Sequence, residues 1–219
     1  AEVKVTNVRD TSFTVSWSTN VMATGWVNYG TSSANTSTGL STSLNQTAYD
    51  DCGANAIGKN HHVTIHGLSP QTTYYFEVVS GATVDDHEDS YYQATTGPTL
   101  ELPASDSIYG RVFEEDGLTP AEGVIVYVIL RDADGVGDPG EAGVMSALVD
   151  SEGWWHANLG NARLTDGSNV FTYSAAGDVV TLVAKDAGVG LVTQTIDTGD
   201  LRPAAPLISR PAISKPISR

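Results

Sequence analysis

Residues 13–18 read Phe-Thr-Val-Ser-Trp-Ser, a strict alternation of large apolar and small hydroxyl side chains. Successive side chains of a β-strand point to opposite faces, so this stretch predicts a strand with one buried face and one polar face. No run of ten or more residues carries an apolar stripe of helical period. The alternation predicts an all-β chain of antiparallel strands, and it recurs at Val3/Val5, Val63/Ile65 and Tyr74/Phe76/Val78.

A change of composition divides the chain in two. Residues 95–105 read Thr-Thr-Gly-Pro-Thr-Leu-Glu-Leu-Pro-Ala-Ser, which predicts a linker. Each half holds about seven short strands in about 90–100 residues, the size of a sandwich domain. In the second half we expect strands at 108–113, 123–131, 144–149, 154–157, 169–173, 179–184 and 191–196. The sequence therefore predicts two antiparallel β-sandwich domains in tandem, at 1–97 and 107–200, with a linker at 98–106 and an extended tail at 201–219.

Charge and composition exclude several classes of partner. The 219 residues include 11 basic and 26 acidic side chains, a formal net charge of −15. This balance argues against nucleic acid and anionic membranes as partners. No apolar run approaches the ~20 residues of a membrane-spanning helix. Cys52 is the single cysteine, so no intrachain disulfide can form, and the neighbouring acids Asp50 and Asp51 disfavour its thiolate.

The run Gly67-Leu-Ser-Pro-Gln-Thr-Thr-Tyr74 gives the first half a family resemblance. Together with Trp17 and the run Val27-Asn-Tyr-Gly30, it resembles a fibronectin type III domain, in the version that precedes the catalytic domain of purple acid phosphatases. The resemblance covers residues 1–96 and implies a corner in which the Tyr74 hydroxyl bonds back to the chain. Phosphatase activity does not follow, because no second block of Asp, Asn and His metal ligands is present.

The second half carries a different set of motifs. These are Tyr109-Gly-Arg-Val112, Thr119-Pro-Ala-Glu-Gly-Val-Ile-Val126 and Val149-Asp-Ser-Glu-Gly-Trp-Trp155. They resemble a carboxypeptidase-regulatory or Cna-B-like sandwich of the kind found in bacterial surface proteins. The resemblance implies that Gly153 closes a turn, that Trp155 points inward and that Trp154 points outward.

Acidic residues gather in the segment 132–141, Asp-Ala-Asp-Gly-Val-Gly-Asp-Pro-Gly-Glu. Carboxylates two and four positions apart on a glycine-bent loop can converge on a hard cation, and calcium prefers six to eight oxygen ligands. The candidate ligands are Asp132, Asp134, Asp138 and Glu141. A solvated hairpin loop rich in turn formers is the equal alternative. Apart from this structural calcium, we expect no cofactor.

Two features of the sequence relate to carbohydrate: glycosylation sequons and aromatic residues. Residues 31–47 are dominated by hydroxyl side chains and hold two acceptor sequons, at Asn35 and Asn45. These would carry glycans in an extracellular protein, although sequons also arise by chance in such sequence. A stacking surface for sugar rings is an alternative to cross-strand pairing for the aromatic residues Trp26, Tyr91, Tyr92 and Trp154.

A catalytic centre is not expected. The chain has no Gly-x-Ser-x-Gly motif. His62 and His66 point outward from one predicted strand, but they stand about 13 Å apart, too far for one tetrahedral metal. We therefore expect them to form a strand surface without ligands.

After Asp200 the chain becomes basic and proline-rich. Residues 202–219 hold four bases and no acid, whereas residues 1–200 hold seven bases and 26 acids, so a tail of +4 follows a body of −19. This asymmetry favours docking of the tail, by edge addition or as a polyproline-like segment, over the disordered end that is its alternative. The residues expected to contact a neighbouring subunit are Leu207, Ile208, Arg210, Ile213, Lys215, Ile217 and Arg219.

These expectations combine into one function. We expect an extracellular or cell-surface structural subunit, not an enzyme, that assembles into a filament or array through its C-terminal tail. Copies of itself are the expected partners, with surface glycans as a further class. The alternative is a carbohydrate-binding or spacer module of a secreted hydrolase. Ala1 in place of Met fits a processed protein.

Overall fold

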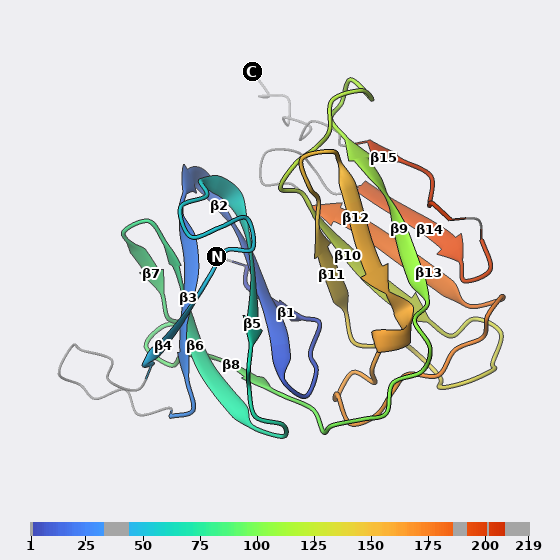
Figure 1. Ribbon diagram of the computed structural model, residues 1–219, viewed down its shortest axis with the longest axis horizontal. Helices are drawn as coiled ribbons and strands as arrows, with labels where there is room; N and C mark the ends of the chain where they lie inside the picture. Colours follow the sequence, from blue (N-terminus) through green and yellow to red (C-terminus); the bar gives the residue numbers. More distant parts are fainter. Residues whose placement is uncertain (1, 33–43, 186–191, 201, 209–219) are drawn as a thin grey trace, which may run out of the picture.

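The computed structural model describes residues 2–32, 44–185, 192–200 and 202–208. Within these ranges the regular secondary structure consists of β-strands and one 3-10 turn, η1 (Leu159–Asn161). The predicted fold class is confirmed: antiparallel sheets form two sandwiches that lie side by side (Figure 1). None of the described residues forms a helix with the length and apolar character needed to cross a membrane.

The first sandwich consists of two antiparallel sheets. One is ordered β1 (Lys4–Thr6), β2 (Ser12–Ala23), β5 (Gly58–His66). The other is ordered β4 (Gln46–Tyr49), β3 (Gly25–Gly30), β6 (Thr73–Ser80), β7 (Thr83–Asp85), and β8 (Tyr92–Thr95) also pairs with β6. The alternation read from the sequence holds, because Phe13, Val15 and Trp17 of β2 are all buried in the core.

The tyrosine corner of the first sandwich is also confirmed. The Tyr74 hydroxyl accepts a hydrogen bond of 2.9 Å from the backbone N–H of Ser69, at the turn that leads into β6. The Tyr74 ring is buried and lies 6.3 Å from the ring of Phe13 on the facing sheet. The corner therefore ties the sandwich edge to its core.

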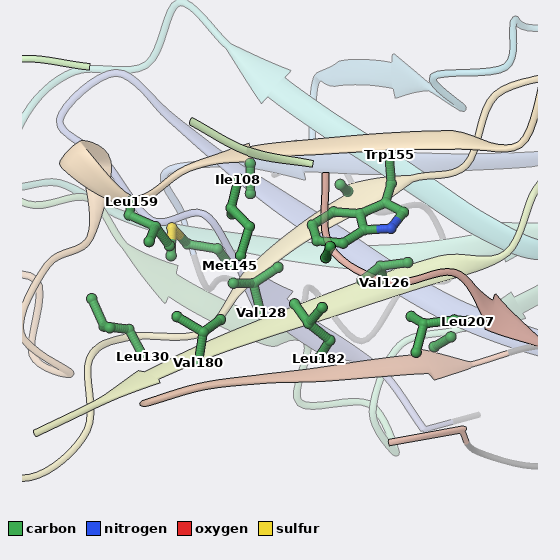
Figure 2. Packing of buried hydrophobic residues seen from close by; sticks show 14 of the residues in the cluster. Ile108, Val126, Val128, Leu130, Met145, Trp155, Leu159, Val180, Leu182 and Leu207 are labelled. Atoms are coloured by element: carbon green, nitrogen blue, oxygen red, sulfur yellow. The ribbon is translucent and has the colours of Figure 1, made fainter. Parts of the chain in front are cut away.

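The second sandwich has the same two-layer plan. One sheet is ordered β11 (Met145–Leu148), β10 (Ile125–Arg131), β13 (Val179–Lys185), β14 (Val192–Asp197), and the other β12 (Trp154–Asn158), β9 (Ser107–Phe113), β15 (Leu207–Ile208). Figure 2 shows the side chains of both sheets meeting in one apolar core. Trp155 is buried there and Trp154 lies outside it, as predicted, after a turn at Gly153 with φ +85°.

The strand predicted at 169–173 is wrong. This segment makes one isolated bridge, between Arg163 and Val170, in place of a ladder. The reason is a side chain: the Asp138 carboxylate accepts both the backbone N–H and the hydroxyl of Thr172, each at 2.7 Å. A donor that a neighbouring strand would use is thereby satisfied locally.

The start of the tail gives the largest difference from the sequence prediction. Residues 202–208 fold back on their own sandwich: Leu207 pairs with Val112 and Ile208 with Phe113, in parallel with β9. The Leu207 side chain is buried in the core (Figure 2). The prediction that the tail leaves its own body from Arg202 onward is therefore wrong for residues 202–208, and Leu207 is not an intersubunit residue.

Polar contacts of Arg202 and Ala204 hold this segment in place. The Arg202 guanidinium forms an ion pair with Asp106 and donates to the carbonyl of Ser107 at 2.6 Å. The backbone N–H of Ala204 donates to the carbonyl of Tyr109 at 2.8 Å. Ile208, the last described residue, keeps 45% of its surface exposed. The predicted contacts at Arg210, Ile213, Lys215, Ile217 and Arg219 lie outside the described residues.

Candidate functional site

The two sandwiches meet through polar faces. The outer face of β1, β2 and β5 lies against β10 and β11 of the second sandwich (Figure 1). The hydroxyls of Ser16 and Tyr127 lie 2.9 Å apart, and those of Thr6 and Ser146 lie 2.6 Å apart, with both pairs buried. Such hydrogen bonds fix a geometry, because a buried polar group that loses its partner costs free energy.

Asn7 joins the sandwiches by imitating a strand partner. Its side-chain amide donates to the carbonyl of Ser146 at 2.9 Å and accepts from the N–H of Ser146 at 3.0 Å. Its backbone N–H donates to the carbonyl of Val144 at 3.1 Å. Asn7 has φ +52°, a left-handed conformation that asparagine adopts more readily than most residues. The end of β1 therefore pairs with the edge of β11 in the other sandwich.

A chain of three side chains crosses the same interface. His62 Nδ1 lies 2.7 Å from Asp51 Oδ2, and His62 Nε2 lies 2.9 Å from Ser146 Oγ. Burial favours the neutral Asp51, but hydrogen bonds from His62 and Thr64 outweigh it and hold the pKa of Asp51 below its usual range. The prediction that His62 faces outward is correct for its own sheet, but that face is covered by the second sandwich.

An Asp–His–Ser chain is also the arrangement of nucleophilic hydrolases, where the histidine activates the serine. Here Ser146 is buried, and its Oγ also contacts Thr6 at 2.6 Å and the Asn7 amide at 3.2 Å. Its backbone N–H, a usual donor to an oxyanion, is bound by Asn7. The chain of contacts therefore stabilises the interface and lacks an accessible nucleophile.

Arg163 links the second sandwich to the linker and to the first sandwich. Its guanidinium is almost fully buried and donates to the carbonyl of Pro98 at 2.9 Å. Its Nη2 lies 3.9 Å from Asp10. Burial lowers the pKa of Arg163, but arginine stays protonated in proteins. The linker is thus bound on both sides of the interface.

The acidic segment 132–141 splits into two groups. Asp132 and Asp134 meet Asp178, and one carboxylate oxygen from each lies within 4.8 Å of the others. The sequence prediction missed Asp178, which lies just before β13, far from the acidic segment in the sequence. Its buried carboxylate accepts from the N–H of Ala133 at 2.8 Å. No nearby spacing could have revealed this residue.

The other two predicted ligands are placed elsewhere. Asp138 binds Thr172, as described above, and Glu141 forms an ion pair of 2.7 Å with Arg131. The structure therefore does not bring the four predicted ligands, Asp132, Asp134, Asp138 and Glu141, together in one group. Calcium at Asp132 and Asp134, now with Asp178, stays a prediction, and these three carboxylates would supply ligands for a hard cation.

The remaining candidate residues are dispersed. Asn45 is exposed just before β4, whereas Asn35 lies outside the described residues. Burial and the nearby Asp50 carboxylate raise the pKa of the Cys52 thiol, which fits the expected unreactive cysteine. The four aromatic residues considered for sugar stacking do not form one surface, because Tyr91 is buried and Trp154 belongs to the second sandwich.

Comparisons with known proteins support the first sandwich. Residues 2–96 match the family model described as purple acid phosphatase, N-terminal domain. This domain has a fibronectin III-like fold and is not the catalytic part of those proteins. The Cna-B-like resemblance of the second sandwich gains no support from the comparisons and stays a prediction. No curated protein matches the chain.

One similar solved structure contains the FN1–FN3 domains of chicken CNTN1. It is 11% identical, with a TM-score of 0.30, and the match covers 90% of this chain and 64% of that chain. The present chain therefore spans less than two thirds of the solved one. The fibronectin-type fold of the first sandwich follows from its sheets, its tyrosine corner and the family match.

Proposed function

We propose that the chain is an extracellular structural subunit in which two fixed sandwiches form a stiff spacer and residues 209–219 bind a neighbouring copy. The observation that carries this proposal is the buried polar interface, where Asn7 and His62 of one sandwich bind Ser146 of the other. A spacer needs a constant angle between its domains, and side-chain networks of this kind supply it. Fibronectin III-like domains serve as structural or spacer modules, which agrees with this role.

Charge supports the assembly step. Residues 1–208 carry eight bases and 26 acids, a net charge of −18, whereas residues 209–219 carry three bases and no acid. Opposite charges on a body and on a short segment attract and orient each other. The contacts of residues 202–208 with β9 fix the point from which this segment starts. Eleven residues reach about 36 Å when extended, enough to cross a neighbouring sandwich.

Deletion of residues 209–219 tests the proposal. The variant keeps every strand that the structure describes, so we expect an unchanged thermal melting curve but monomers in analytical ultracentrifugation and negative-stain imaging. A full-length control in which Arg210, Lys215 and Arg219 become glutamine separates charge from length. Assemblies that persist after the deletion would contradict the proposal.

A second candidate is a spacer module of a larger secreted hydrolase. The match of residues 2–96 to the N-terminal domain of purple acid phosphatases favours it, because that domain accompanies a catalytic one. A full-length chain that stays monomeric at every concentration and ionic strength would favour this candidate over a self-assembling subunit.

A further inference from the structure

A groove of about 560 Å³ opens between the two sandwiches. Its floor is formed by Ala147 and Leu148 of β11, and one wall by the outer face of β9 and β12. The opposite wall comes from the first sandwich, where Asp51 and His62 line it. The groove therefore exists only because the interface holds the two sandwiches together.

Aromatic rings on two paired strands form the wall of the groove. Tyr109 of β9 and Trp154 of β12 have ring centroids 6.2 Å apart, at an interplanar angle of 49°. The Arg111 guanidinium lies 5.1 Å from the centroid of the Trp154 ring. Tyr109 remains 36% exposed, and Trp154 is partly exposed. Rings held on strands present apolar faces at little entropic cost on binding.

We propose that this groove binds residues 209–219 of a second copy of the chain, an inference that rests on the proposed function. The segment reads Ser-Arg-Pro-Ala-Ile-Ser-Lys-Pro-Ile-Ser-Arg. Proline-rich segments favour an extended polyproline conformation and dock into grooves lined by aromatic residues. Pro211 and Pro216 supply the rings that stack on Tyr109 and Trp154.

Charge gives the segment a second reason to bind here. The carboxylates of Asp51 and Asp150 line the groove, and the Glu152 side chain follows in the same turn. Arg210, Lys215 and Arg219 are the bases that would face them. Arg111 and His156 also lie at this wall, and Arg111 contacts the Trp154 ring. The acidic residues Asp51 and Asp150 are therefore the lining groups that would attract a basic segment.

The place where the described chain ends favours a neighbour over the chain's own tail. In the sheet order β12-β9-β15, the last strand lies on the opposite side of β9 from β12 (Figure 1). β15 runs parallel to β9 and reaches Phe113, so it leads away from the end of β9 that holds Tyr109. At Ile208 the chain therefore points away from the groove wall, on the far side of β9 from β12, which favours the segment of a second copy as the occupant.

The test uses the full-length chain and a matched pair of tryptophans. Trp154→Ala removes the aromatic wall, whereas Trp26→Ala removes a partly exposed tryptophan on β3, outside the groove. We expect the Trp154 variant to raise the concentration needed for assembly at least tenfold, as loss of an aromatic anchor does. The Trp26 variant should assemble like the original chain. Melting curves show whether each variant is folded.

Substitutions within residues 209–219 test assembly without altering the core, because these residues come after β15, the last strand that the structure describes. Pro211→Ala with Pro216→Ala should weaken assembly in the same way as Trp154→Ala. A photo-crosslinking residue at position 213 should join β9 or β12 in mixtures of isotope-labelled and unlabelled copies. Crosslinks between labelled and unlabelled chains support the proposal, and crosslinks confined to single chains overturn it.

The outcomes separate this inference from the proposed function. If deletion of 209–219 abolishes assembly but Trp154→Ala does not, the subunit role stands and the groove is not the acceptor. If neither change affects assembly, both proposals fail. A glycan array that shows binding of an oligosaccharide, lost in Trp154→Ala while assembly is unchanged, would assign the groove to sugar and overturn the inference.

Discussion

At the scale of single residues, one side chain can bind two domains together, and Asp51 shows how. It accepts hydrogen bonds from the backbone N–H of Thr64 at 2.9 Å and from its hydroxyl at 2.7 Å, and it orients His62 toward Ser146. Because His62 Nδ1 faces Asp51 Oδ2, the other ring nitrogen, Nε2, is directed toward the Ser146 hydroxyl. Asp51 thus acts on the second sandwich through His62.

The lowered pKa of Asp51 predicts a loss of stability in acid. The carboxylate is favoured by the folded state, so its contribution is complete above the ordinary pKa of 3.8. As the pH falls through that value the unfolded chain takes up the proton first, and stability declines until the folded carboxyl is protonated too. We expect Asp51→Asn to flatten this part of a melting-temperature profile between pH 6 and pH 3.

Glu101→Gln is the control, because Glu101 is an exposed carboxyl of the linker. Its profile should follow that of the unaltered chain. If the Asp51 variant loses stability in acid as steeply as the unaltered chain does, Asp51 does not couple its protonation to folding.

At the scale of elements, two-residue periodicity predicts strands well but not what covers them. The alternation at 13–18 correctly places Phe13, Val15 and Trp17 in the core, and polar residues on the other face. The same pattern arises whether that face meets water or another polar face, so the burial of Ser16 and His62 could not be read from it. The sequence prediction missed Asp178 for the same reason, because only the fold brings its carboxylate close to Asp132.

The strand pairing of the tail could not be predicted from its sequence pattern. Neither parity of residues 207–219 is cleanly apolar, so the sequence pattern does not specify a strand register. The structure needs only one deep side chain, Leu207, and two residues of strand pairing with β9. A parallel edge strand of this length has no periodicity to recognise.

Leu207 and Ile208 form a matched pair for testing this element. Leu207→Ala leaves a cavity in the core and should lower the free energy of unfolding by about 2–5 kcal/mol. Ile208→Ala, at a position with 45% exposure, should cost much less. Denaturant unfolding followed by near-ultraviolet circular dichroism measures both. Equal effects at the two positions would show that β15 is not held by the core.

At the scale of the whole molecule, the interface makes two domains behave as one body. Hydrogen bonds from β2, from β5 and from Asn7 just after β1 reach Tyr127, Ser146 and Val144 of the second sandwich. Arg163 and the linker contact at Pro98 close the other end of the junction. Contacts at both ends oppose rotation about the linker, which a single flexible connection would allow.

We expect the two sandwiches to unfold together. Asn7→Ala leaves the N–H and carbonyl of Ser146 without their partner and should cost about 1–3 kcal/mol. Calorimetry should then resolve two transitions where the unaltered chain shows one, and small-angle scattering should show a broader range of domain angles. Asn45→Ala, at an exposed asparagine, should leave both measurements unchanged. A single transition in the Asn7 variant would contradict the role of Asn7 as a coupling residue.

The parallel course of β15 along β9 also determines how the subunit would transmit force. Tension applied at the C-terminal end of β15 and directed along that strand pulls it parallel to β9. The contacts at Ser107, Tyr109, Val112 and Phe113 are then loaded in shear, all at once, and not peeled one after another. Leu207 would have to leave the core in the same event. A pull from the next subunit would therefore meet the most resistant geometry that so short a strand can offer.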